Sequence, residues 1–434
     1  MTTDHPAPST GIDDALIAAD RGEDLFVTGR AGTGKSTLLQ RIVTRLSQPA
    51  LIVAPTALAA MNAGGTTIHR AFGFAPRREL SDVLTGSYDP AERTWEALNR
   101  AGVLVVDEVS MVRVDLFDAM DRALRLLRDR PRTPFGGMQV LLFGDLRQLP
   151  PVAGPADLRV LTDAGYSSEY FISSLVMAQW SPRIISLTTA FRQHDPDYLA
   201  VLGAVRSGTL DESGLALLNR VCDDDGWDPQ SRAVYLTPYR AAVEHMNARG
   251  LATVEGAPVE FPASATGEVR PTDWAAFEER LVVKQGARVV ATINDPAGRW
   301  VNGSTGVVTL AEDGADVIRV QFDGRRSSTD VERMTLTLQR PGVADADFIM
   351  EDVGSLTQFP LRLGWAMTIH KAQGLTLDRV YLDLARGAFA PGQTYVALSR
   401  VRSHDDLRLA RPVRTADVRP YPPAVLDYLA DIDG

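Results

Sequence analysis

The sequence contains a single cysteine, Cys222, among 434 residues. An intrachain disulfide is therefore excluded, and so is a zinc site built from several cysteines. No apolar run is long enough to span a bilayer, and the first residues, MTTDHPAPSTG, lack the basic start and apolar stretch of a secretory signal. We therefore expect a cytoplasmic protein with no membrane association, lying with the nucleoid if the source is bacterial.

Basic residues are outnumbered by acidic ones. The chain carries 45 Lys and Arg against 55 Asp and Glu, which gives a formal net charge of -10. This balance argues against a basic coat for non-specific nucleic-acid binding. A basic channel stays open as an alternative, because a groove that follows a phosphate backbone needs only a local lining. The chain length predicts two or three domains.

The apolar pattern predicts an α/β fold with one interruption. Short apolar runs that end in polar residues or glycine, as buried parallel strands do, occur at 25–29, 50–56, 102–108 and 138–145. A strand at 233–238 followed by a helix at 240–252 indicates a second α/β unit. Residues 286–352 contain short strands separated by turn residues, so they predict an all-β insertion. We expect a disordered start at 1–12, a first domain at 13–185, and a second at 186–285 and 353–434.

A phosphate-binding loop lies between the first strand and its helix. Residues 29–37, GRAGTGKST, match the pattern G-x-x-x-x-G-K-[ST] in the strand–loop–helix context that it requires. In such a loop Lys35 reaches the β and γ phosphates of ATP, and Ser36 is a ligand of Mg²⁺. We assign ATP binding to Gly29, Gly32, Thr33, Gly34, Lys35, Ser36 and Thr37.

Two later strand ends supply groups for hydrolysis. VVDEVS at 105–110 places Asp107 where it can hold Mg²⁺ and Glu108 where it can accept a proton from the attacking water. FGDLRQLPP at 143–151 places Gln148 where an amide can orient groups at the γ phosphate. A kinase, a GTPase and a motor are all compatible with these residues.

Seven motifs in order carry a resemblance to a known family. They are GRAGTGKST, APTALAAMNAGGTTIHRAFG, VVDEVSM, PFGGMQVLLFGDLRQLPPV, FRQ, TIHKAQGLTLD and YVALSR. Together they resemble the petite-integration-frequency (PIF) family of superfamily-one DNA helicases over nearly the whole chain. Residues 115–152 are the most specific part, because TIHKAQG and YVALSR are shared with RecD-like relatives.

The resemblance implies two RecA-like domains with parallel sheets and ATP in the cleft between them. It also implies a small β-barrel at 286–352 and a short wedge-type insertion at about 74–98. DNA-stimulated hydrolysis would drive 5′-to-3′ movement on single-stranded DNA and unwinding of tailed or forked duplexes. Arg192 in FRQ and Arg400 in YVALSR would act as arginine fingers. We expect a monomer.

The family pattern also suggests contacts to the DNA backbone. It carries over onto Thr56, His69, Thr237, Asn247, Thr368, His370 and Lys371. Hydroxyl, imidazole and amide groups suit phosphate and sugar contacts that carry no sequence information. For each residue taken singly, a helix cap or a loop hydrogen bond is an equally good interpretation.

One departure concerns the base of the nucleotide. The family has a glutamine before the phosphate loop that grips adenine, whereas the first glutamine here is Gln40, after the loop. We therefore expect GTP or CTP to replace ATP in part. An ATP-gated module that binds or loads nucleic acid without unwinding is the alternative function. RNA remains an alternative to DNA, since only 2′-hydroxyl contacts separate the two.

Overall fold

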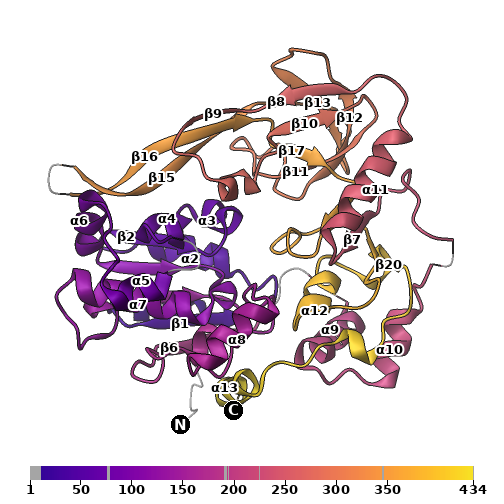
Figure 1. Ribbon diagram of the computed structural model, residues 1–434. Helices are drawn as coiled ribbons and strands as arrows, with labels where there is room; N and C mark the ends of the chain where they lie inside the picture. The colour runs from indigo at the N-terminus through magenta and orange to yellow at the C-terminus, as the bar shows by residue number, and fades with distance from the viewer. Residues whose placement is uncertain are drawn as a thin grey trace, which may run out of the picture.

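The computed structural model describes residues 11–433 except 76–78, 190–192, 194, 224 and 345–346. Two parallel β-sheets and a β-rich region form the molecule (Figure 1). Residues 1–10 of the predicted disordered start lie outside the described part, and Ile12 already begins helix α1. Across the described ranges, no helix has the length and apolar character needed to cross a membrane.

The first sheet has six parallel strands in the order β3-β2-β4-β5-β1-β6. The strands are β1 (Leu25–Gly29), β2 (Ala50–Ala54), β3 (Thr66–Thr67), β4 (Val103–Val106), β5 (Gln139–Phe143) and β6 (Arg183–Leu187). The helices are α1 (Ile12–Asp20), α2 (Lys35–Val43), α3 (Ala57–Ala63), α4 (Ile68–Phe72), α5 (Glu79–Thr85), α6 (Glu92–Arg100), α7 (Val114–Leu127) and α8 (Pro155–Asp163). The predicted parallel α/β fold is confirmed, and β6 carries the first sheet past the predicted boundary at 185.

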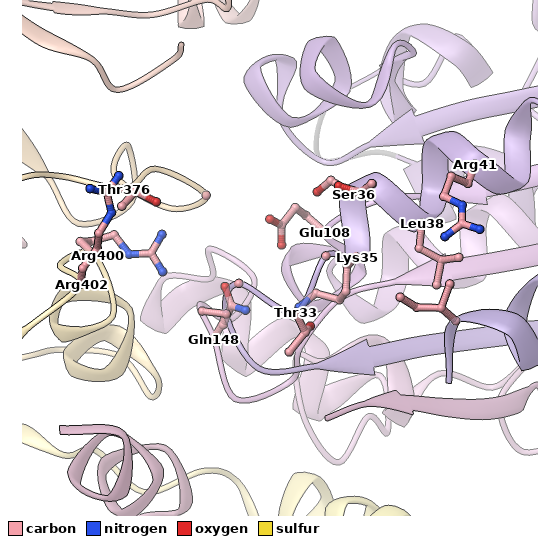
Figure 2. Close-up of a pocket in the computed structure, with 16 residues that line it drawn as sticks. Thr33, Lys35, Ser36, Leu38, Arg41, Glu108, Gln148, Thr376, Arg400 and Arg402 are labelled. Atoms are coloured by element: carbon pink, nitrogen blue, oxygen red, sulfur yellow. The ribbon is translucent and has the colours of Figure 1, made fainter. Parts of the chain in front are cut away.

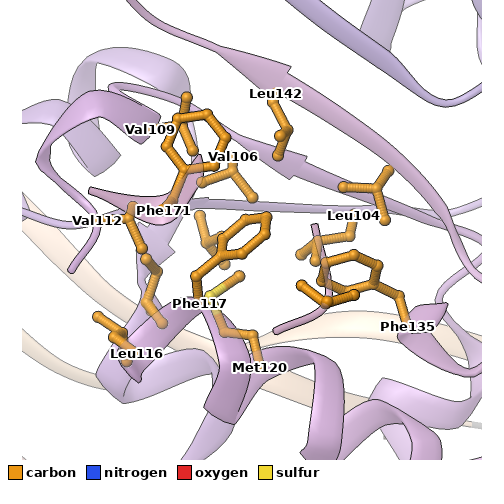
Figure 3. Close-up of a cluster of buried hydrophobic side chains, with 14 of the residues drawn as sticks. Leu104, Val106, Val109, Val112, Leu116, Phe117, Met120, Phe135, Leu142 and Phe171 are labelled. Carbon is orange, nitrogen blue, oxygen red and sulfur yellow. The ribbon is translucent and has the colours of Figure 1, made fainter. Parts of the chain in front are cut away.

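The two faces of this sheet carry separate hydrophobic cores. Successive residues of a strand point to opposite faces. Leu104 and Val106 of β4 therefore pack with Phe117 of α7 (Figure 3), whereas Val103 and Val105 pack on the side of α1 and α2. Burial on both faces explains why these strands appear in the sequence as continuous apolar runs.

The second sheet is smaller and also parallel, with the order β18-β7-β19-β20. Its strands are β7 (Val234–Thr237), β18 (Ala366–Thr368), β19 (Val380–Leu382) and β20 (Leu407–Leu409). The accompanying helices are α9 (Pro196–Ser207), α10 (Glu212–Asn219), α11 (Arg240–Ala252) and α12 (Gln393–Leu398). β7 and β18 are neighbours although more than a hundred residues separate them, because the β-rich region is inserted between them.

The β-rich region runs from β8 to β17 and is wider than the predicted 286–352. Its strands are β8 (Val259–Pro262), β9 (Ser264–Gly267), β10 (Arg280–Val283), β11 (Arg288–Ala291), β12 (Thr305–Leu310), β13 (Val317–Phe322), β14 (Thr329–Glu332), β15 (Met334–Ala344), β16 (Asp347–Gln358) and β17 (Leu361–Leu363). Five of them form an antiparallel sheet in the order β14-β13-β12-β11-β17. Within the described residues β14 and β17 do not pair, so backbone hydrogen bonds do not close this sheet into the expected barrel.

The long hairpin β15–β16 reaches from the β-rich region to the first domain (Figure 1). Its strands contact α6, inside the region where a wedge-type insertion was expected. The hydroxyl of Thr66 donates to the carbonyl of Gln339 at 2.8 Å. Nearby, Arg70 of α4 forms an ion pair with Asp273, and each side chain is 4% exposed. The β-rich region is therefore fastened to the first domain by buried polar contacts.

The C-terminal helix α13 (Pro423–Asp433) returns to the first domain (Figure 1). Tyr421, Val425 and Leu429 belong to the core cluster that surrounds Phe117. The expectation that the whole of 353–434 belongs to the second domain is therefore wrong for this last segment. The sequence does not show which of the two sheets this helix covers.

Candidate nucleotide site and nucleic-acid face

A phosphate loop joins β1 to α2. Gly29, Gly32 and Gly34 have φ angles of 151°, 79° and 87°, which only glycine adopts readily. A Cβ on Gly29 would lie 2.6 Å from the carbonyl oxygen of Leu187. The ammonium group of Lys35 donates to the carbonyl of Gly29 at 2.7 Å. The loop thus presents the first amides of α2 and one cation to the same space, which is an anion-binding arrangement.

The loop opens into a cavity of about 720 Å³. Its walls come from loops and helices of both domains, as Figure 2 shows. The described residues that line it are Ile12, Ala31, Gly32, Thr33, Gly34, Lys35, Ser36, Thr37, Leu38, Arg41, Glu108, Gln148, Gly374, Thr376, Arg400 and Arg402. Most of the predicted ATP-binding residues are therefore brought together in one space.

The two predicted carboxylates follow β4 directly. Asp107 is 8% exposed, and burial together with the neighbouring Glu108 raises the pKa of Asp107 to about 7. Burial also raises the pKa of Glu108, although Lys35 opposes the change. Glu108 has a φ of 50° and accepts a hydrogen bond from the Gln373 amide at 3.1 Å. A base with a raised pKa is better matched to proton transfer near neutral pH.

Gln148 sits beside a buried ion pair. Its amide donates to Asp145 at 3.2 Å, and Arg206 of α9 donates to the same carboxylate at 2.8 Å. Burial would raise the pKa of Asp145, but Arg206 and Lys35 outweigh it, so the pKa lies below the ordinary value. Arg206 belongs to the second domain, so this pair crosses between domains.

The opposite wall of the cavity carries two arginines (Figure 2). Arg400 is 1% exposed, and it donates to the carbonyls of Val396, Ala372 and Leu375 and to the Ser399 hydroxyl. Arg402 also lines the cavity and was not predicted from the sequence. Arg192, the other predicted finger, lies outside the described residues.

The far end of the cavity is lined by Ile12, Leu38 and Arg41. Figure 2 places Leu38 and Arg41 away from Arg400. None of these side chains is an amide that could read the edge of a base. Sequence patterns did not single them out, since an isoleucine at the start of a helix and an arginine on another helix belong to no motif.

The predicted DNA-binding residues fall into two groups. Thr237 is fully buried, and the Asn247 amide donates to and accepts from the backbone of Ala366. In this structure both side chains make contacts within the protein, and their contact with DNA stays a prediction. Thr56 caps α3 by accepting from the Ala59 amide at 3.2 Å, and Thr368 accepts from the Lys371 amide in the same way.

The other group keeps accessible side chains. His69 and His370 are half-buried, and Lys371 is exposed. Burial lowers the pKa of His370, so its imidazole is neutral near neutral pH. Partial desolvation of its ammonium group and nearby arginines lower the pKa of Lys371 to about 8. His370 and Lys371 lie just after β18, at the carboxyl end of a strand of the second sheet.

Comparison with known proteins identifies the family. The model of the PIF1-like helicase family matches residues 11–211. A relative from Bdellovibrio bacteriovorus, named ATP-dependent DNA helicase Pif1, is 33% identical over 404 residues, which cover 91% of this chain and 86% of that relative. The chain belongs to the PIF1-like helicase family. It covers a smaller share, 59%, of the fungal and human relatives it matches.

Two solved structures of Pif1 from Bacteroides extend the PIF1-like match over nearly the whole chain. Each is 32% identical to this chain and covers 99% of it, with 98% of the solved chain matched. The complex with ADP-AlF4 has a TM-score of 0.87, and the form bound to single-stranded DNA has a TM-score of 0.70. The present arrangement of domains is therefore closer to the first of these two PIF1-like structures.

Proposed function

We propose that the chain is an ATP-dependent DNA helicase, a translocase that moves 5′ to 3′ on single-stranded DNA and unwinds tailed or forked duplex. One observation carries the proposal: a single cavity holds the phosphate loop and Glu108 on one side and Arg400 and Arg402 on the other. ATP bound in that cavity would touch both domains at once. Its hydrolysis would then change the distance between them.

The polar groups at the cavity suit hydrolysis as well as binding. Glu108 would accept the proton of the attacking water, a role that typically contributes about 10²- to 10⁴-fold in rate. Gln148 and Lys35 would hold the γ phosphate. Arg402, or Arg400 after leaving its present partners, would stabilise charge in the transition state.

A Mg²⁺ ion fits this donor set. Ser36 offers a hydroxyl at the start of α2, and the buried Asp107 carboxylate is a hard oxygen donor. Oxygen donors of this kind are what Mg²⁺ takes in nucleotide sites, where it neutralises phosphate charge. Both halves of the site come from one chain, so a monomer would suffice for hydrolysis. The proposed place of action is the cytoplasm, where ATP and DNA are both present.

The decisive test is ATP hydrolysis with and without single-stranded DNA, with matched RNA beside it. Strong stimulation by DNA supports a coupled motor, and unwinding should then require a 5′ tail rather than a 3′ tail. Tight ATP binding without stimulation by either strand would reject it in favour of the ATP-gated module. The hydrogen bonds that Arg400 makes within its own domain agree with the ATP-gated module, because they keep its guanidinium from contacting the γ phosphate.

Two variants test the site directly. Glu108→Gln should keep ATP binding and lose at least about 10²-fold in hydrolysis, as expected for removal of a general base. Lys35→Ala should abolish hydrolysis with the fold intact. The matched control is Glu255→Gln, since Glu255 is exposed and distant in sequence from every cavity residue. A near-normal rate in Glu108→Gln would remove Glu108 from the role of base.

A further inference from the structure

Three aromatic side chains meet at the carboxyl edge of the second sheet. Tyr239 follows β7, His370 follows β18, and Phe389 lies in the loop between β19 and α12. The ring centroids of His370 and Phe389 are 6.1 Å apart, and the rings are nearly parallel at 15°. The ring of Tyr239 also contacts Phe389, with the centroids 6.1 Å apart and the ring planes tilted by 52°. We call Tyr239, Phe389 and His370 the aromatic ladder.

Phe389 is the exposed member of the aromatic ladder. Its side chain is 54% exposed, although phenylalanine is usually buried in folded proteins. A lone exposed apolar residue needs no explanation. This one differs, because it stacks on a residue already expected at the nucleic-acid face, and because its loop is held in place.

The loop that carries Phe389 is fastened along most of its length. The Phe389 amide donates to the side chain of Gln393, which is fully buried, at 3.0 Å. Tyr239 donates to the Gly387 carbonyl at 3.2 Å, and Arg419 donates to the Ala388 carbonyl at 2.9 Å. Earlier in the loop Ala385 adopts a φ of 46°, which is unfavourable for a residue with a Cβ. A strained and fastened loop thus presents an exposed ring, which is the signature of a preorganised contact.

Basic side chains flank the aromatic ladder. Lys371 follows His370 directly, and Arg386 lies three residues before Phe389; both are exposed. Alternation of aromatic and basic groups is how sequence-tolerant sites grip a single strand, since every base has a flat face and every nucleotide a phosphate. Ligands of parallel sheets also bind at the carboxyl ends of the strands, where these residues lie.

We propose that the exposed ring of Phe389 is a stacking platform for a base of single-stranded DNA, with His370 and Tyr239 supporting it from behind. The proposal rests on the proposed function, because it names the contact by which the strand is held. It adds a base contact to a face for which sequence motifs suggested only backbone contacts. Hydrophobic stacking of this kind discriminates poorly among bases, so the grip would serve a strand of any sequence.

The test compares two strands. Binding of the full chain to a fluorescent single-stranded DNA and to the same strand with abasic sites throughout is measured by anisotropy. Phe389→Ala should weaken binding to the base-containing strand by roughly 5- to 150-fold, the range for loss of one stacked base. Binding to the abasic strand should not change. Phe389→Trp should restore the preference for bases.

Three outcomes would overturn the platform. Equal weakening on both strands would show that Phe389 only supports the fold of the loop, and no weakening on either would show that the ring is not used. Failure of Phe389→Trp to restore binding, with Phe389→Ala impaired, would also point to packing rather than stacking. The control is Val160→Ala, which removes another exposed apolar side chain from α8 in the first domain. If the unaltered chain binds neither strand, the proposed function itself fails.

Discussion

Removal of Arg206 should destabilise the protein through the carboxylate it leaves behind. Arg206 and Asp145 approach to 2.8 Å, and their side chains are 13% and 1% exposed. In Arg206→Met the apolar stem is kept but the charge is lost. Among the described residues, Asp145 would then keep the Gln148 amide, the Arg147 backbone N–H and the field of Lys35. Breaking a buried pair on one side typically lowers the free energy of unfolding by about 3–5 kcal/mol.

The pH dependence of this loss has a definite sign. In the unaltered protein the pKa of Asp145 is lowered, since Arg206 and Lys35 outweigh burial. A lowered pKa stabilises the folded state above the unfolded pKa of about 3.9, and this stabilisation is lost as the pH falls through the folded value. Arg206→Met removes part of it. The difference in free energy of unfolding between Arg206→Met and the unaltered protein should therefore be largest near neutral pH and shrink toward about pH 4.

Urea unfolding at neutral and acidic pH measures this difference. The matched control is Arg183→Met, which breaks a pair whose side chains are 48% and 34% exposed and should change stability by less than about 1 kcal/mol. Combining Arg206→Met with Asp145→Asn should recover part of the loss, because no buried charge is left unpaired. A loss below about 1 kcal/mol at neutral pH, equal to that of the control, would refute the reasoning.

Three other perturbations have expected outcomes. Gly392→Ala should slow ATP hydrolysis, because a Cβ there would lie 2.1 Å from the Gln148 carbonyl oxygen; Gly208→Ala, with a similar positive φ but open space, is the control. Affinity for single-stranded DNA should fall as the pH rises past about 8, the pKa of Lys371, and Lys371→Arg should flatten that profile in anisotropy titrations. GTP and CTP should support hydrolysis with kcat/KM within about tenfold of ATP, since no glutamine precedes Gln40; a larger preference would contradict relaxed base recognition.

Local chemistry explains why much of the nucleotide site could be predicted. The phosphate loop is a contiguous stretch whose glycines and Lys35 act where they stand in sequence. Asp107 and Glu108 follow an apolar strand, and parallel strands bring their carboxyl ends to one edge of the sheet. These predictions needed only the strand–loop–helix pattern. They required no knowledge of how the two domains pack.

Residues that act across the cleft could not be predicted in this way. Arg402 and Arg41 line the cavity only because two domains and a helix converge there. Thr237 and Asn247 show that packing also adds contacts that a motif does not specify. In this structure Thr237 is buried and the Asn247 amide pairs with the backbone of Ala366, contacts that the motif alone did not predict. A motif specifies which residue stands at a position, whereas packing decides which way its side chain points.

The return of α13 to the first domain has a mechanical consequence. The chain passes from the first domain to the second after β6 and returns before Pro423, so two segments of the backbone connect the domains. Tyr421 lies on the returning strand, and its hydroxyl donates to the carbonyls of Arg147 and Arg206, at 2.9 and 3.4 Å. Two covalent connections allow the domains fewer relative rotations than one connection would, so we expect the cleft to open in fewer directions.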